Sequence, residues 1–283
     1  MTIVTNGGPG RDYLQAEYVM NLYRGCSFGC IYCYARSTYY EKTADFSAIR
    51  PKENALEIVR NDLRRKVKRG VVLTGGVSDA YNPLEKELKI TRNALELLNA
   101  FEFGITIITK SNLVIRDMDI LTDIQQNAPV SVNFSITCAD NALAQKVEPH
   151  VPSTSVRFAA IKALSNAGIP AGLLIDPVLP FITDTPENIR ELVKMAALHG
   201  AKYAYISPSV TLADIQRDYF YTEVDKHFQY ISEKYKKRYD QRYRCQSPYA
   251  KKACEIFGQT CEAEGLLYDM KAVNQHLRMG YKM

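Results

Sequence analysis

The sequence predicts an α/β fold in which helices wrap a parallel sheet, and two observations lead to this prediction. Up to about residue 212, short runs rich in β-branched residues alternate with longer amphipathic stretches. This is the pattern of strands joined by crossover helices. The alternation yields six β/α units, whereas eight such units close a full barrel. Six units therefore fall short of a closed barrel.

The predicted strands and helices follow one another in a regular order. The strands are residues 18–23, 71–74, 105–109, 130–136, 171–177 and 203–207. The helices between them are residues 54–68, 87–101, 116–126, 154–166 and 186–199. Several of these helices are opened by a capping residue such as Ser153 or Asp184, whose side-chain oxygen accepts from the free N–H groups of the first turn.

The alternation stops at about Leu212, and helices dominate from there to residue 283. We predict helices at residues 222–239, 248–264 and 269–280. Residues 1–211 are therefore expected to form the α/β core. Residues 212–283 are expected to form a helical C-terminal extension that covers the mouth of the core.

Composition places the chain among ordinary globular proteins. Its 283 residues fit one large α/β domain with a small addition, and 46% hydrophobic residues suffice for a full core. The first ten residues lack a basic region followed by an apolar run, so no signal peptide is expected. The longest apolar stretch, residues 169–182, is broken by three prolines and Asp176, which argues against a membrane span. Seven cysteines favour a reducing cytoplasm.

Basic residues are clustered, although the net charge is only +5. Residues 58–70 hold six Lys or Arg against Asp62, and residues 226–252 hold nine, interleaved with tyrosines, against Glu233 and Asp240. Such surfaces suit nucleic acid through phosphate contacts and base stacking, and a solvated helix face is the alternative. We favour the solvated face for the first cluster and leave both interpretations open for the second.

The most informative segment is GCSFGCIYCYAR, residues 25–36. It spaces Cys26, Cys30 and Cys33 as C-x3-C-x-x-C in a loop rich in tyrosine and glycine. Three such thiolates hold one side of a metal cluster, and in a four-iron cluster they leave the fourth iron open to a non-protein ligand. The loop follows the first predicted strand, which places it at the carboxyl end of the sheet, where parallel α/β folds bind ligands.

A zinc site, a disulfide framework and a ferredoxin-type cluster fit these cysteines less well. A structural zinc site needs a fourth Cys or His ligand nearby, and the first histidine of the chain is His150. A disulfide framework suits small secreted domains, whereas this chain is long and crowds its first three cysteines into one loop. A ferredoxin-type cluster normally takes its fourth cysteine locally or beside a downstream proline.

The loop resembles the signature of the radical S-adenosylmethionine (SAM) superfamily. Five segments in order resemble its spore photoproduct lyase-like branch, often labelled DNA repair photolyase-like: NLYRGCSFGCIYCYAR, TGGVSDAYNPLEKELKITRNALELL, ITKSNLVIRDMDIL, VNFSITCADNALAQKVEPHVPS and AGIPAGLLIDPVLPFITD. The resemblance implies a partial (β/α)6 TIM-type barrel of the radical SAM kind. It also implies a [4Fe-4S] cluster on Cys26, Cys30 and Cys33 that cleaves SAM to a 5′-deoxyadenosyl radical.

The resemblance also implies positions that bind SAM. Ser78 and Asp79 match a Ser-Asp pair placed near the SAM amino group, whose hydrogens need an acceptor. Lys110 matches a lysine that pairs with the SAM carboxylate. Ser135 matches another polar contact, and Tyr32 is expected beside the adenine. A surface salt bridge is the alternative for Asp79 and Lys110, and a core hydroxyl is the alternative for Ser135.

The sequence departs from the lyases at the position that matters most for their reaction. The lyases carry a catalytic cysteine just before the Ser-Asp pair, which returns a hydrogen atom to the product radical. Here the stretch is TGGVSD, and Gly76 stands in that place. Tyr32 and Tyr34 match tyrosines proposed to relay a hydrogen atom in the lyases. We therefore do not expect repair of the spore thymine dimer.

Four further cysteines have no assigned role in the signature. Cys138 follows a predicted strand close to the expected SAM site, so it is a candidate for a substitute hydrogen donor, with packing as the alternative. Cys245, Cys254 and Cys261 could hold an auxiliary cluster, although their spacings of nine and seven residues are wide for one loop.

The resemblance and the second basic cluster together favour a radical SAM enzyme that acts on a nucleic acid or nucleotide. Modification of a peptide or protein is the alternative within enzymes, and a non-catalytic iron–sulfur protein that binds nucleic acid is the alternative outside them. An external electron donor such as flavodoxin or ferredoxin is implied, and no membrane partner is expected.

Overall fold

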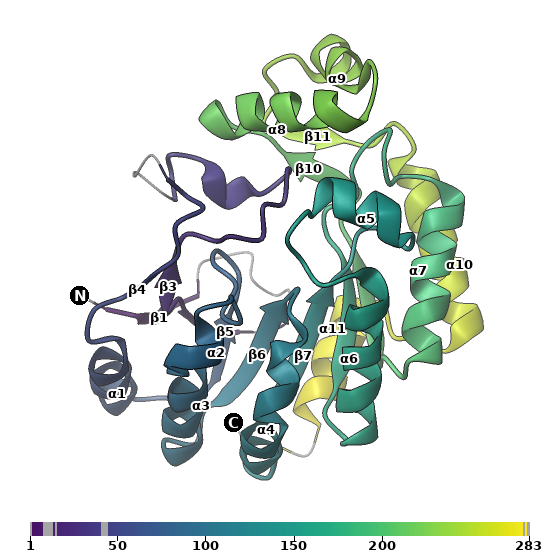
Figure 1. Ribbon diagram of the computed structural model, residues 1–283. Coiled ribbons are helices and arrows are strands. Elements are labelled where there is room, and N and C mark those ends of the chain that lie inside the picture. The colour runs from purple at the N-terminus through teal and green to yellow at the C-terminus, as the bar shows by residue number, and fades with distance from the viewer. Residues whose placement is uncertain (1, 8–13, 15, 41–44, 280, 282–283) are drawn as a thin grey trace.

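A seven-stranded sheet forms the centre of the computed structural model, which describes residues 2–7, 14, 16–40, 45–279 and 281 (Figure 1). Its strands, in spatial order, are β1 (Val4–Asn6), β2 (Tyr18–Met20), β5 (Val71–Thr74), β6 (Gly104–Thr109), β7 (Val130–Ser135), β8 (Ala171–Ile175) and β9 (Tyr203–Ile206). Neighbours from β2 to β9 pair in parallel, and only β1 pairs antiparallel. The six predicted parallel strands are confirmed.

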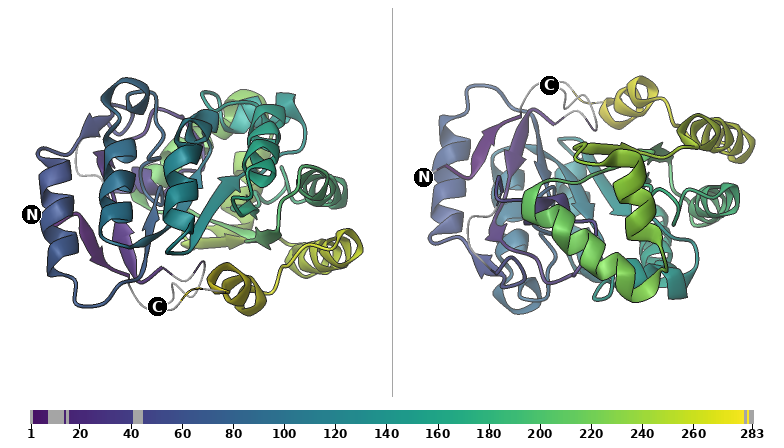
Figure 2. Two further views of the ribbon diagram at one scale, coloured as in Figure 1. Left: turned by 90° about the horizontal axis from the view of Figure 1, so that it is seen from below. Right: turned by 90° about the horizontal axis from the view of Figure 1, so that it is seen from above.

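Helices cover the outer face of this sheet, and the main core lies between them (Figure 2). These helices are α1 (Ala55–Arg65), α3 (Ile90–Ala100), α4 (Met118–Gln125), α6 (Thr154–Asn166) and α7 (Pro186–Leu198). Strand residues such as Ile107, Phe134 and Leu173 pack against helix residues such as Leu95 and Phe158, and all five are fully buried. Burial of this kind stabilises the fold by about 1.5–3 kcal/mol for each large apolar side chain.

The inner face of the sheet is polar near its middle. The Tyr203 hydroxyl donates to Asn133 (2.6 Å), whose amide donates to Thr106 (3.1 Å). Gly172 makes room for this arrangement, because a Cβ there would lie 2.1 Å from the Tyr203 ring. These buried polar groups satisfy one another's hydrogen-bonding capacity, so the inner face needs no apolar side chains in the middle of the sheet.

The helices beyond residue 212 occupy two different places. Helices α8 (Asp214–His227) and α9 (Ile231–Tyr239) lie over the carboxyl end of the sheet, as the view from above shows (Figure 2). Helix α10 (Ala250–Glu264) instead packs beside α7 in the main core, and α11 (Met270–Arg278) packs against residues of β8 and β9. The predicted covering of the mouth is therefore too broad, since α10 and α11 bury their apolar faces on the body of the fold.

Several predicted elements are divided in the structure. The helix expected at 222–239 is α8 followed by α9, because Tyr230 between them has φ +60°. The helix expected at 87–101 is α2 (Glu85–Leu88) followed by α3, with Lys89 at φ +52°. The strand expected at 18–23 ends at β2, and β3 (Tyr23–Arg24) pairs with β4 (Arg50–Pro51) in a separate ribbon.

Besides β1 and β4, the unpredicted short elements include the helix α5 (Asn141–Val147), the 3-10 turns η2 (Tyr34–Arg36) and η3 (Asn112–Asp117), and the antiparallel strands β10 (Ser209–Thr211) and β11 (Arg244–Gln246). Strand β11 lies between the helices expected at 222–239 and 248–264. None of the helices in the described part of the chain has both the length and the apolar composition needed to cross a membrane.

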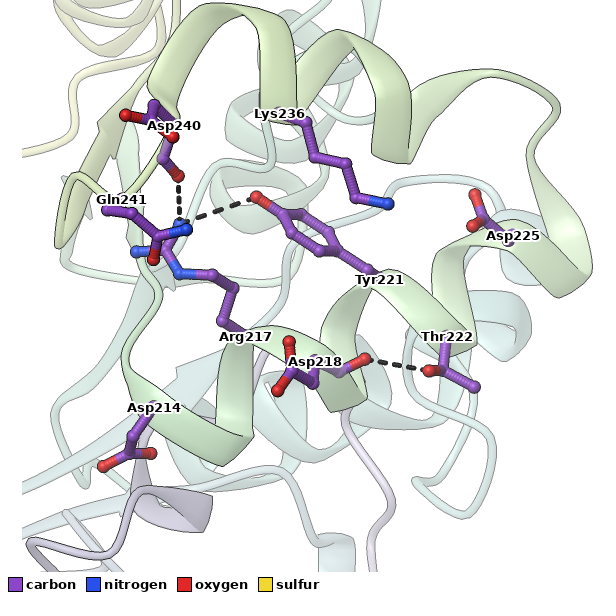
Figure 3. Close-up of a pocket in the computed structure, with 9 residues that line it drawn as sticks. All are labelled: Asp214, Arg217, Asp218, Tyr221, Thr222, Asp225, Lys236, Asp240 and Gln241. Carbon is purple, nitrogen blue, oxygen red and sulfur yellow. Dashed lines mark hydrogen bonds between the residues drawn. The ribbon is translucent and has the colours of Figure 1, made fainter.

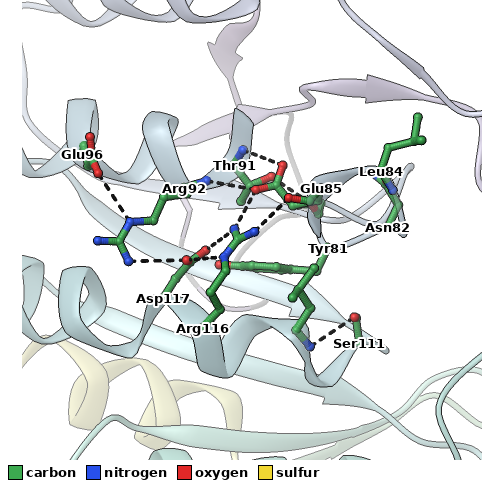
Figure 4. A network of polar contacts seen from close by, with 12 residues as sticks. Tyr81, Asn82, Leu84, Glu85, Thr91, Arg92, Glu96, Ser111, Arg116 and Asp117 are labelled. Atoms are coloured by element: carbon green, nitrogen blue, oxygen red, sulfur yellow. Dashed lines mark hydrogen bonds and ion pairs between the residues drawn. The ribbon is translucent and has the colours of Figure 1, made fainter. Parts of the chain in front are cut away.

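A buried ionic network fixes α2, α3 and η3 to one another (Figure 4). The Arg116 guanidinium bridges two fully buried carboxylates, at 2.7 Å from Glu85 and 2.7 Å from Asp117. Glu85 also accepts from the backbone N–H of Thr91 and from the hydroxyl of Tyr23 in β3. Because β3 leads directly into the cysteine loop, this network holds the start of that loop.

Candidate active site

A cavity of about 400 Å³ opens at the carboxyl end of the sheet. Residues that directly follow the parallel strands line it, namely Gly75, Gly76, Lys110, Asp176 and Ser207. The cysteine loop closes one side, and the β10–β11 hairpin closes another. The cavity therefore lies where parallel α/β folds place their ligands.

The cysteine loop is anchored from both sides. On one side the Cys26 N–H donates to the Phe46 carbonyl (2.8 Å), and on the other the Ile31 N–H donates to the Val147 carbonyl (3.0 Å). Gly25 begins the loop at φ +73°, and a Cβ there would lie 2.3 Å from the Ala48 carbonyl oxygen. Only glycine fits that position, so this residue sets the path of the loop.

Cys26, Cys30 and Cys33 all line the cavity, and none forms a disulfide. Burial, reinforced by the neighbouring Cys33 and Asp79, raises the pKa of the Cys26 thiol to about 11. Burial also raises the pKa values of Cys30 and Cys33. Thiols in such surroundings become thiolates when a bound cation replaces the proton. The donor set therefore fits a metal centre.

The arrangement suits a cluster better than a single ion. Across the described residues, no three His, Cys, Asp or Glu side chains are grouped closely enough to hold one metal ion. A four-iron cluster presents its irons at separate corners, so its cysteine ligands need not converge on one point, whereas the ligands of tetrahedral zinc must.

Asp79 and Lys110 are brought together in the wall of the cavity, close to Cys26 and Cys30. The Asp79 carboxylate accepts from the Thr109 hydroxyl (2.8 Å) and the N–H groups of Tyr81 and Lys110 (2.8 Å each). A carboxylate has about four acceptor sites, so part of its capacity is left for a ligand. Burial lowers the pKa of Lys110, but the charges of Cys30 and Glu148 outweigh it and raise the pKa overall.

Ser78 and Ser135 are not among the residues that line the cavity. The Ser78 hydroxyl donates to the Gly25 carbonyl, and the Ser135 hydroxyl donates to the Asp176 carbonyl (3.2 Å). Each serine thus holds backbone that borders the cavity. Direct contact between either serine and SAM stays a prediction.

Tyr32 is fixed by a buried chain of polar groups. Its hydroxyl donates to Glu148, which pairs with Arg157 at 2.7 Å, and both charged side chains are 1% exposed. Arg157 also donates to the Ser135 carbonyl (2.8 Å). The hydroxyl therefore points toward Glu148, while the ring lines the cavity with the Lys110 ammonium 5.8 Å from its centre.

Tyr34 reaches across the cavity to the position that lacks the lyase cysteine. Its hydroxyl donates to the carbonyl of Gly76, and both residues line the cavity. A Cβ built on Gly76 would meet only Leu73 Cδ2, at 3.5 Å. The space beside Gly76 is therefore open to a small side chain, which this sequence does not supply.

The remaining cysteines do not join this site. Cys138 is fully buried beside Thr137, outside the cavity lining, and burial raises its pKa to about 12. Its role as a hydrogen donor stays a prediction that the geometry does not favour. Cys245 and Cys261 lie in two different apolar clusters and Cys254 is exposed, so the structure does not assemble an auxiliary cluster from them.

Three cavity residues were missed from the sequence. Asp176 lies in the segment GLLIDPVLP, and burial raises the pKa of its carboxyl group. Tyr243 and Arg244 come from β11 and its approach, between the helices expected at 222–239 and 248–264. A strand-end aspartate was a usable signal, but nothing in the sequence near residue 243 indicated a three-residue strand.

A second hollow, of about 680 Å³, lies on α8 and α9 away from the cysteines (Figure 3). It is lined by four aspartates together with Arg217 and Lys236. The Arg217 guanidinium is already bound by the carbonyl groups of Leu212, Asp240 and Arg242, at 2.8 Å each. This hollow therefore owes its shape to a packing arginine that ties α8 to the chain around β11.

The fold and the three cysteines together define a class of protein. Residues 20–196 match the radical SAM superfamily model, which is more than half of the chain. The chain belongs to the radical SAM superfamily, and it is accordingly an enzyme whose cofactors are a [4Fe-4S] cluster and SAM.

The comparisons with individual proteins agree with this family. Uncharacterized proteins of Mycobacterium tuberculosis (strain H37Rv) and Methanocaldococcus jannaschii are 33% and 35% identical, over 69% and 62% of this chain. The chain spans only 59% of the mycobacterial relative and 66% of the archaeal one.

Among solved structures, a spore photoproduct lyase complexed with dinucleoside spore photoproduct matches with a TM-score of 0.70. The match covers 94% of this chain and 78% of the lyase at 18% identity. The radical SAM methyltransferase TsrM from Kitasatospora setae matches with a TM-score of 0.50 over 69% of this chain and 37% of its own, at 13% identity. The predicted resemblance to the lyase branch is thereby confirmed at the level of the fold.

Proposed function

We propose that this enzyme abstracts a hydrogen atom from a nucleic acid or nucleotide held above the cysteine loop. When bound, the reduced cluster and SAM supply the 5′-deoxyadenosyl radical that performs the abstraction. An external donor such as flavodoxin or ferredoxin delivers the electron, and the reducing cytoplasm is the compartment that suits seven unpaired cysteines.

The observation that carries the proposal is the rim of the cavity. Tyr34 and Tyr243, which are 37% and 59% exposed, line it together with Arg244. Exposed aromatic rings stack on bases whatever the sequence, and a guanidinium pairs with phosphate. A cavity with three cysteines on one wall and this rim at its mouth suits a nucleotide with its base inside and its phosphate outside.

Asp79, Lys110 and Tyr32 hold SAM in this proposal. Asp79 accepts from the amino group of SAM, and the Lys110 ammonium pairs with its carboxylate. Lys110 directly follows β6, and Asp79, in the loop after β5, is held to the end of β6 by the Thr109 hydroxyl and the Lys110 N–H. The buried Glu148–Arg157 pair holds the Tyr32 ring in the cavity wall, so this ring can border the adenine without moving.

Tyr34 is the proposed donor that returns a hydrogen atom to the product radical, and the tyrosyl radical left behind takes an electron from the external donor and a proton from solvent. Its hydroxyl lies at Gly76, the position where the lyases carry cysteine, whereas the Tyr32 hydroxyl is bound to buried Glu148. A phenol is a poorer hydrogen-atom donor than a thiol, so we expect a product radical different from that of the spore thymine dimer. The lyase structure with its dinucleoside supports the substrate class and not the identical lesion.

The test is the formation of 5′-deoxyadenosine by the reconstituted, reduced enzyme under anaerobic conditions. We expect single-stranded RNA or DNA to raise the rate several-fold above uncoupled cleavage, and nucleoside mass spectrometry to identify the altered nucleotide. Deuterium introduced into that nucleotide should appear in 5′-deoxyadenosine. Stimulation by a peptide library and not by nucleic acid would overturn the proposal in favour of protein modification.

A further inference from the structure

A groove of about 570 Å³ begins where the catalytic cavity ends. It lies between the end of α9, strand β11 and the start of α10, and Arg244 lines both the groove and the cavity. Arg242, Arg244 and Gln246 all line the groove, as expected of alternate residues along an extended strand. Strand β11 is thus the wall that separates the two hollows and joins them at Arg244.

The groove is strongly basic. Its charged lining residues are Arg238, Arg242, Arg244 and Lys251, and no carboxylate lies among the described residues that line it. Asp176 in the catalytic cavity interacts electrostatically with Arg244, and Glu255 lies 4.0 Å from a Lys251 side chain that is 94% exposed. An exposed ion pair such as Lys251–Glu255 contributes little binding energy, so Lys251 stays available to a phosphate. Four cations around one groove therefore create a strongly positive potential beside the cavity mouth.

The hollow on the other side of α8 and α9 carries the opposite charge. Figure 3 shows its four aspartates, Asp214, Asp218, Asp225 and Asp240, with Lys236 as the cation not bound by carbonyl groups. A polyanion leaving the cavity would be repelled on that side and attracted on the side of β11. The opposite charges of the two hollows therefore favour a path of the strand along β11.

We propose that this basic groove binds the backbone phosphates of nucleotides that flank the target, so that the substrate is a single-stranded polynucleotide and not a free nucleotide. The inference rests on the proposed function and adds the path of the strand. A cavity of about 400 Å³ that SAM must also occupy has no room for a base pair, so the target base must leave any duplex stack. Arg244 meets the phosphate at the mouth, and the other three cations meet those that follow.

The test measures binding of fluorescein-labelled 12-nucleotide RNA and DNA of one sequence to the cluster-loaded enzyme across a series of salt concentrations. The variant is Arg238→Ala/Arg242→Ala/Lys251→Ala, whose three side chains are exposed. We expect binding to weaken by about tenfold or more. The slope of log affinity against log salt should fall by about 2, because each single-strand phosphate contact contributes about 0.7. The groove variant should lose less affinity for a dinucleotide, measured by competition, than for the 12-nucleotide strand.

The matched control is Arg60→Ala/Arg64→Ala/Arg65→Ala on α1, which removes three exposed charges from another face and should bind like the wild type. Thermal melting verifies that both variants are folded. Equal weakening by both variants, no weakening by the groove variant, or equal competition by a poly-glutamate peptide would overturn this inference alone. Failure of the wild type to bind nucleic acid of any length would instead overturn the proposed function.

Discussion

Gly75 and Gly76 are neighbours after β5 with opposite tolerance for a side chain. Gly75 has φ +87°, and a Cβ on it would lie 1.8 Å from the Ile108 carbonyl oxygen. Gly76 has no such obstacle and faces the cavity. The backbone conformation therefore requires glycine at position 75. Position 76 could carry a small side chain, and glycine there leaves the cavity without a thiol.

We expect Gly76→Cys to fold and to place a thiol in the cavity, next to the Tyr34 hydroxyl. The wild type should release no thymine from the synthetic spore thymine dimer, while Gly76→Cys should gain slow release, because a thiol gives up its hydrogen atom more readily than a phenol. Gly76→Ser is the control of equal size and should stay inactive. Multiple turnovers by the wild type would contradict the prediction and direct attention to Cys138.

Replacing any one of Cys26, Cys30 and Cys33 with Ala should abolish the iron–sulfur absorbance and reductive SAM cleavage, since two thiolates do not hold a four-iron cluster against solvent. Cys254→Ala is the matched control, because Cys254 is exposed and lies outside the cavity. Absorbance and iron content are measured after anaerobic reconstitution. A triple variant that still cleaves SAM would show that the assigned ligands are wrong.

Lys110→Ala should keep the cluster and weaken SAM binding. It removes a charge-assisted contact worth about 1.5–3 kcal/mol, which is about ten- to a hundredfold in affinity. Lys86→Ala, on the exposed side of α2, is the control and should bind SAM normally. Calorimetric titration of SAM into the cluster-loaded proteins separates the two. Equal affinity of both variants for SAM would show that Lys110 does not bind SAM.

At the scale of elements, the Glu148–Arg157 pair ties the segment after α5 to helix α6 and to the cysteine loop. Glu148→Gln leaves a buried guanidinium without its charge partner, so we expect a loss of about 3–5 kcal/mol in the free energy of unfolding. The exposed pair Glu187–Arg190, at 4.0 Å on α7, is the control, and Glu187→Gln should cost about 0–1 kcal/mol. Urea unfolding measures both, and equal costs would show that burial is not the cause.

The sequence predicted the elements of the sheet better than those around the site. The core strands are short runs rich in β-branched residues between amphipathic helical stretches, so they could be placed within a few residues. The hairpin β10–β11 could not, because its two short strands lie in polar, tyrosine-rich sequence and pair across more than thirty residues. Nor did composition mark the breaks at Lys89 and Tyr230, where positive φ divides a predicted helix.

For the molecule as a whole, the motif residues could be predicted from the sequence, whereas the buried residues that hold them in place could not. The cysteines, Asp79 and Lys110 lie at strand ends, which sequence order is enough to identify. Glu148, Arg157 and Glu85 belong to residue types that usually face solvent, and only the tertiary structure shows that they are buried as partners. The resemblance to the lyases likewise indicated the cofactors, while the basic groove depends on residues brought together from α9, β11 and α10.

The packing of α8 and α9 on the cysteine loop has a consequence for how the enzyme is made. Ile31 and Tyr32 share an apolar cluster with Phe220 and Tyr235, and Gln216 donates to the Tyr32 carbonyl across 184 residues of sequence. While the ribosome has synthesised only the sheet, this loop lacks the apolar side chains that α8 and α9 pack against it. We therefore expect cluster insertion to follow synthesis of these two helices.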